Sequence, residues 1–166
     1  MAWFFNRDKR AKADSKSQRQ LSPQMVARGA AERILNSPSD PGFTDALMHF
    51  GHTVDSRCKQ EWIVINMFAT YKGIAASDIP EPFKVTLLRD SIPDAIDELA
   101  ARPEDERASF REFVQARFSE YDSALAETQP FALPAALAWH LVASEDIAIA
   151  YFARLTFHNL MMIELD

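Results

Sequence analysis

The stretch formed by residues 147–165, IAIAYFARLTFHNLMMIEL, is almost continuously apolar and most constrains the fold of this chain. Its polar or charged residues are Arg154, Thr156, His158, Asn159 and Glu164. A helix with so few polar positions has no ordinary solvent-facing side, so neighbouring elements must cover it on most sides. The stretch therefore predicts the central helix of a helical bundle, or half of a subunit interface.

The polar interruptions of this helix predict where its surface is open. Arg154, His158 and Glu164 occupy few positions, and we expect them to mark one narrow strip that meets a ligand or a partner. Residues 160–163, by contrast, are four adjacent apolar residues and cover every side of a helix. They predict a homodimer, the alternative being that the helix is fully covered inside the monomer.

Helical periodicity governs the rest of the chain, and no β-type alternation persists. Apolar residues recur every three or four positions from Phe43 to Phe68, which predicts one long helix over residues 44–72. This helix either spans the whole molecule or bends near Gly51. Ser22 followed by Pro23 is a typical helix start. Further helices are predicted at residues 23–35, 82–89, 91–101, 103–127 and 134–143. We therefore expect an all-α, single-domain bundle of about six helices over residues 22–166.

Residues 1–21 differ in composition from the rest and predict a flexible basic arm with an aromatic tip. Residues 6–20 contain no large apolar side chain, so they bury too little surface to offset the entropy of ordering. The residues expected to dock are Trp3, Phe4, Phe5, Arg7, Lys9 and Arg10. Aromatic rings beside basic residues favour docking to a partner protein or, alternatively, to an anionic membrane surface.

The charge distribution bears on the class of partner. Residues 1–33 carry a net charge of +5, whereas the remainder carries −11. A basic arm alone provides only non-specific, salt-dependent affinity for nucleic acid. The acidic remainder argues against a broad nucleic-acid-binding face, so we expect a protein partner.

One group of polar residues has the spacing of a metal site. On a continuous helix, Asp45, His49, His52 and Ser56 would share one face. Two histidines one turn apart, with Asp45 as a third ligand, are suited to a transition metal. The alternative is a solvated polar face, and the paired Glu-x-x-His motifs of di-iron bundles are absent from the sequence. No other cofactor is expected.

Motifs for other chemistry are absent from the sequence. The four glycines are scattered, which excludes a glycine-rich phosphate loop, and there is no G-x-S-x-G nucleophile motif. Cys58 lies on the apolar stripe and is predicted to pack in the core. A single cysteine also suits the cytoplasm. We expect a non-enzymatic protein-binding or adaptor module; the alternatives are a metal-dependent or small-ligand-binding protein centred on His49 and His52, and a peripheral membrane protein anchored through its N-terminus.

Overall fold

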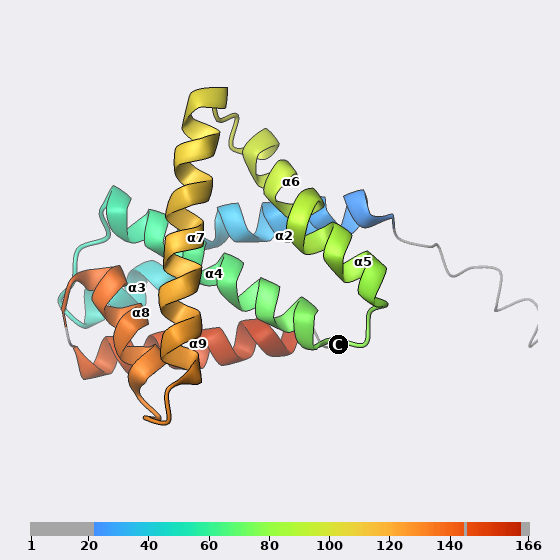
Figure 1. Cartoon of the computed structure of the whole chain (residues 1–166). Coiled ribbons are helices and arrows are strands. Elements are labelled where there is room, and N and C mark those ends of the chain that lie inside the picture. The colour runs from blue at the N-terminus through green and yellow to red at the C-terminus, as the bar shows by residue number, and fades with distance from the viewer. Residues whose placement is uncertain (1–21, 145, 164–166) are drawn as a thin grey trace, which may run out of the picture.

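The computed structural model describes residues 22–144 and 146–163, without the side chains of residues 160–163. This part of the chain consists of helices joined by short loops and has no strand, which confirms the all-α helical bundle (Figure 1). The predicted arm, residues 1–21, lies outside the described residues. In chain order the elements are α2 (Pro23–Asn36), η1 (Ser37–Ser39), α3 (Pro41–His49), α4 (Ser56–Ala76), α5 (Glu81–Thr86), η2 (Leu87–Ser91), α6 (Ile92–Leu99), α7 (Glu104–Ala126), α8 (Ala132–Val142) and α9 (Ile147–Ile163).

The helix that is covered on most sides is α4. It packs against α2, α7, α8 and α9, and α7 crosses it in Figure 1. All residues from 64 to 70 are buried, a run that includes every side of the helix. By contrast, α9 packs one side against α4 and α8 and leaves Ile147, Tyr151 and Leu155 exposed. The enclosed position expected for the C-terminal helix is therefore occupied by α4.

Because α4 is apolar on opposite sides, it separates two hydrophobic clusters. One cluster joins α4 to α3, α7, α8 and α9, with Phe68 and Tyr121 among its fully buried residues. The other joins α4 to α2, η2, α6 and α7, with Leu87 and Ile96 among its fully buried residues. Phe118 of α7 packs against both clusters. The two halves of the core are thus continuous through α4 and α7.

The predicted single helix over residues 44–72 is wrong, because the chain breaks after His49. Gly51 adopts φ +80°, a left-handed conformation that favours glycine. The His52 N–H donates to the Leu47 carbonyl at 2.9 Å and the Gly51 N–H to the Met48 carbonyl at 3.0 Å, which is the Schellman termination of a helix. A new helix, α4, begins after Asp55, whose Oδ1 accepts from the Cys58 N–H at 2.7 Å.

The two helices predicted at residues 82–89 and 91–101 form one helical run in the structure. Between α5 and α6 lies η2, a π-helical turn in which the Ile92 N–H donates to the Leu87 carbonyl. Pro93 follows directly, and in an α-helix its ring would press against the carbonyl of Arg89. The wider π turn relieves this contact, so the helix continues through a proline that was expected to start a new one.

Candidate functional site

The residues of the predicted metal site are not brought together as three ligands. Asp45 and His49 lie on α3 and line a hollow between α3 and α9. His52 lies in the loop beyond the break, where its Nε2 is 3.1 Å from Oδ2 of Asp146. Within residues 22–144 and 146–163 there is no group of three His, Cys, Asp or Glu side chains that would hold a metal ion. The one-face arrangement was wrong because the helix ends at His49.

Asp146 has a structural role at the start of α9. Its Oδ1 accepts hydrogen bonds from the Ala148 N–H at 2.8 Å and the Ile149 N–H at 3.4 Å, as a helix N-cap does. Its other oxygen, Oδ2, pairs with His52. The hydrogen bond with His52, followed by that from Ala148, lowers the pKa of Asp146 below its ordinary value. His52 therefore ties the α3–α4 loop to the N-terminus of α9.

This pairing predicts acid sensitivity. A carboxyl group with a lowered folded pKa stabilises the fold above its unfolded pKa, and that contribution is lost as the pH falls through the folded pKa. Asp146→Asn should therefore lower the melting temperature near neutral pH, and its difference from the wild type should shrink progressively as the pH falls below the ordinary aspartate pKa of about 3.9. Thermal unfolding followed by circular dichroism across pH measures this. Asp45→Asn, at an exposed residue of α3, is the matched control. An Asp146→Asn difference that stays undiminished at low pH would contradict the assignment.

The most distinctive surface of the described chain is formed by α8 and α9. Five large apolar side chains there are between 48% and 73% exposed: Phe131, Trp139, Ile147, Tyr151 and Leu155. We call these five residues the α8–α9 face. Ile147, Tyr151 and Leu155 follow one another at four-residue intervals and so form a ridge along one side of α9. Clustered exposure of this kind is typical of an interaction surface rather than of scattered surface residues.

Hollows flank this ridge. Tyr151 lines three of them: one of about 820 Å³ beside α8 that also contacts Trp139, one of about 560 Å³ between α7, α8 and α9, and one of about 620 Å³ toward α3. Leu155 lines the second and third. A ridge with a groove on each side is the shape into which another helix packs.

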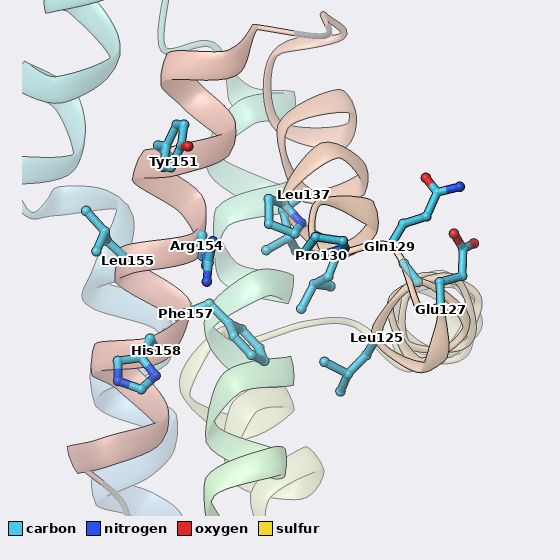
Figure 2. Close-up of a pocket in the computed structure, with 13 residues that line it drawn as sticks. Leu125, Glu127, Gln129, Pro130, Leu137, Tyr151, Arg154, Leu155, Phe157 and His158 are labelled. Carbon is cyan, nitrogen blue, oxygen red and sulfur yellow. The ribbon is translucent and has the colours of Figure 1, made fainter.

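The hollow of about 560 Å³ contains two residues of the strip predicted from the sequence (Figure 2). Arg154 and His158 are exposed on α9 and line it, whereas Glu164 lies outside the described residues. Figure 2 shows Phe157 pointing from α9 toward the end of α7, while Leu155 points to the opposite side.

The rim of this hollow is charged. Glu127, directly after α7, lines the hollow on the side opposite to α9, and its carboxylate points away from α9 in Figure 2. Arg154 forms no salt bridge with any acidic side chain in the described part of the chain. An apolar floor with polar groups at its edge is the usual composition of a protein interface.

A polar network below this surface was not anticipated from the sequence. Arg117 donates to Glu61 through Nε at 3.1 Å and through Nη2 at 2.9 Å, and Glu61 is almost fully buried. Arg117 also contacts Glu120, whose Oε2 lies 2.6 Å from Nε2 of His140. These contacts join α4, α7 and α8. The only sequence signal was the i, i+3 spacing of Arg117 and Glu120.

Burial lowers the reactivity of two groups near this network, the Tyr121 hydroxyl and the Cys58 thiol. The Tyr121 hydroxyl is buried and has no hydrogen-bond partner among the described residues, and burial raises the pKa of Tyr121 far above its ordinary value. Cys58 is buried as predicted, and burial, followed by the nearby charge of Asp55, raises the pKa of its thiol to about 11. A thiol with such a pKa is not an effective nucleophile at neutral pH.

Comparison of the chain with protein-family models, with curated proteins and with solved structures finds no match. Among the described residues no single helix is long and apolar enough to cross a membrane; α8 and residues 147–159 of α9 meet the length and composition test only as a pair bent by 108°. The α8–α9 face is therefore the feature of the described chain from which a function is inferred.

Proposed function

We propose that this protein is a non-enzymatic binding module that holds an amphipathic helix of a partner protein on its α8–α9 face. The observation that supports this is the gathering of five large exposed apolar side chains on two adjacent helices. Tyrosine and tryptophan supply much of the binding energy in protein interfaces, and this face presents Tyr151 and Trp139. Phe131 lies edge-on to Tyr151 at 5.8 Å between ring centroids, which limits the freedom of both rings before binding.

The surroundings of the face suggest the chemistry of the partner helix. Its apolar residues would recur every three or four positions and enter the hollows on either side of the α9 ridge. Arg154 stands beside the ridge without an acidic partner in residues 22–144 or 146–163. We therefore expect the partner helix to carry an acidic residue next to its apolar stripe, because a rim charge of opposite sign orients the docking helix.

The experiment uses helical peptides as the probe. A library of random amphipathic helices is selected against the full chain, and the dissociation constants of the recovered peptides are measured by fluorescence anisotropy. Tyr151→Glu should raise the dissociation constant by about thirtyfold or more, corresponding to the ~2 kcal/mol of an interface hot spot. The matched control is Met25→Glu, which introduces the same charge at an exposed apolar residue of α2 and should change binding less than about twofold.

Three outcomes would contradict the proposal. The first is a set of selected peptides whose affinity Tyr151→Glu leaves unchanged. The second is a mass of twice 18.8 kDa by light scattering that Tyr151→Glu halves, since the occupant would then be a second copy of the chain. The third is co-sedimentation with anionic vesicles that the same variant abolishes, since the face would then bind a membrane.

A further inference from the structure

A second site lies apart from the α8–α9 face, where α4, η2, α6 and α7 line an open cavity of about 370 Å³. It shares no lining residue with the hollows around Tyr151. Its apolar walls are formed by Met67, Leu88, Ile96, Phe110, Val114 and Phe118. A volume of several hundred cubic ångströms with mostly apolar walls and a few polar groups is typical of a small-molecule site.

The first polar group at the cavity is the hydroxyl of Tyr71. Its ring packs edge-on against Phe118, and the hydroxyl has no hydrogen-bond partner among the described residues. Burial raises the pKa of Tyr71 well above its ordinary value, so the hydroxyl stays protonated and able to donate. A half-buried donor beside an open cavity is a place where a ligand acceptor replaces water.

The acidic group at the cavity is already neutralised. Asp97 is almost fully buried; its Oδ2 accepts from Nε of Arg111 at 2.9 Å and from Nη2 at 2.7 Å. Its Oδ1 accepts from Nη1 of Arg102 at 3.4 Å. Asp97 therefore has little capacity left for a cationic ligand. Arg111 also donates to Asp94 at 2.9 Å, which leaves it fixed at the wall rather than free to move.

Besides the side-chain amide of Gln115, a further donor group at the cavity is the guanidinium of Arg89, which belongs to the π-helical turn together with Leu88. Only its Nε is engaged, donating to the adjacent Asp90 at 3.0 Å. That pair is exposed and contributes little, so the guanidinium can turn toward a ligand at small cost. Single π-helical turns inside α-helices occur frequently at functional sites, and here the turn contributes one apolar and one cationic residue to the same cavity.

We propose that this cavity binds a small amphipathic carboxylate, with its apolar chain between α4, α6 and α7 and its carboxylate at Tyr71 and Arg89. Tyr71 and Arg89 offer donors, Gln115 offers both a donor and an acceptor, and the buried acid that lines this cavity, Asp97, is already paired. This set favours an anionic acceptor over a cation. At the ~30 Å³ that one water molecule occupies in the liquid, the cavity has room for about a dozen non-hydrogen atoms. A medium-chain fatty acid has that size.

The test compares three probes that share an eight-carbon chain: octanoate, 1-octanol and octylammonium. Each is titrated into full-length protein carrying ¹³C-methyl methionine, and the Met67 signal reports on the cavity wall. Octanoate should shift the Met67 signal saturably and bind about tenfold or more tighter than octylammonium, as expected for at least one charge-assisted hydrogen bond. The exposed Met48 is the internal control and should not shift with the same saturation.

Two variants locate the bound carboxylate. Arg89→Gln should weaken octanoate binding by about three- to tenfold. The matched control Arg28→Gln removes the same charge from an exposed arginine on α2 and should leave the affinity for octanoate unchanged. Val114→Trp should block the cavity and abolish the Met67 shift. The proposal is overturned if octylammonium binds as well as octanoate, if no saturable Met67 shift occurs, or if Arg28→Gln weakens binding as much as Arg89→Gln.

Discussion

Arg117→Ala should lower the free energy of unfolding by about 3 kcal/mol, because it leaves the buried Glu61 carboxylate without its partner. Breaking such a pair costs about 3–5 kcal/mol, and the lower end applies since the Arg117 side chain is 22% exposed. Glu61 lies on α4 and Arg117 on α7, so the loss should loosen the contact between these two helices. Urea unfolding followed by circular dichroism provides the measurement.

The control for this prediction is Arg28→Ala, which removes an equally long side chain from an exposed pair with Glu32 and should cost less than about 1 kcal/mol. The double variant Glu61→Leu/Arg117→Leu should recover most of the stability, since an apolar pair of similar volume replaces a buried ion pair at little cost. If Arg117→Ala were no worse than Arg28→Ala, Glu61 would have to be hydrated in the folded protein.

Phe68→Ala should destabilise the fold by about 3–5 kcal/mol, the range for removing a fully buried aromatic ring. The Phe68 ring lies 5.2–5.6 Å, between centroids, from the rings of Phe118, Tyr121 and Phe157. Its loss therefore opens a cavity where α4, α7 and α9 meet. Both chemical and thermal unfolding should register the change as a single shifted transition.

The matched control makes the same substitution at an exposed phenylalanine. Phe131→Ala, on the α8–α9 face, should cost less than about 1 kcal/mol because its ring is half exposed. Equal losses at Phe68 and Phe131 would refute the enclosed position of α4. Phe131→Ala should also weaken peptide binding while leaving the free energy of unfolding nearly unchanged. This result would separate the binding role of Phe131 from the core-packing role of Phe68.

Much of the fold was predictable because its signals are local. The Ser22 cap is present, with its side chain accepting from the Met25 N–H at 3.3 Å, and the helix predicted at residues 103–127 appears as α7 with almost the same ends. A bend near Gly51 was one expectation, but the complete break of the helix there was not predicted, since the apolar stripe continues across it from Phe43 to Phe68. A left-handed glycine and an Asp55 cap override the periodicity there.

The candidate sites were less predictable because they depend on which helices meet. The sequence could mark α9 as apolar, but only packing decides that Ile149 is buried while Ile147 is exposed. The cavity at Tyr71 and Arg89 joins residues of α4 and of the π turn that no spacing rule connects. The sequence singled out Arg154 and His158 because they interrupt an apolar run, and the structure places both beside the same hollow; their binding role stays a prediction.

The enclosure of α4 also restricts where residues can be inserted into this chain. Each residue added to a helix turns everything beyond it by about 100° about the axis. In a helix with one solvent-exposed side, such a rotation turns some apolar residues toward solvent, while others still face the core. In α4, residues 64–70 are buried on every side, so an insertion there would exchange the contacts of the two hydrophobic clusters at once. Loops such as the one between α7 and α8 are therefore where insertions should be tolerated, and α4 is where the chain must keep its register.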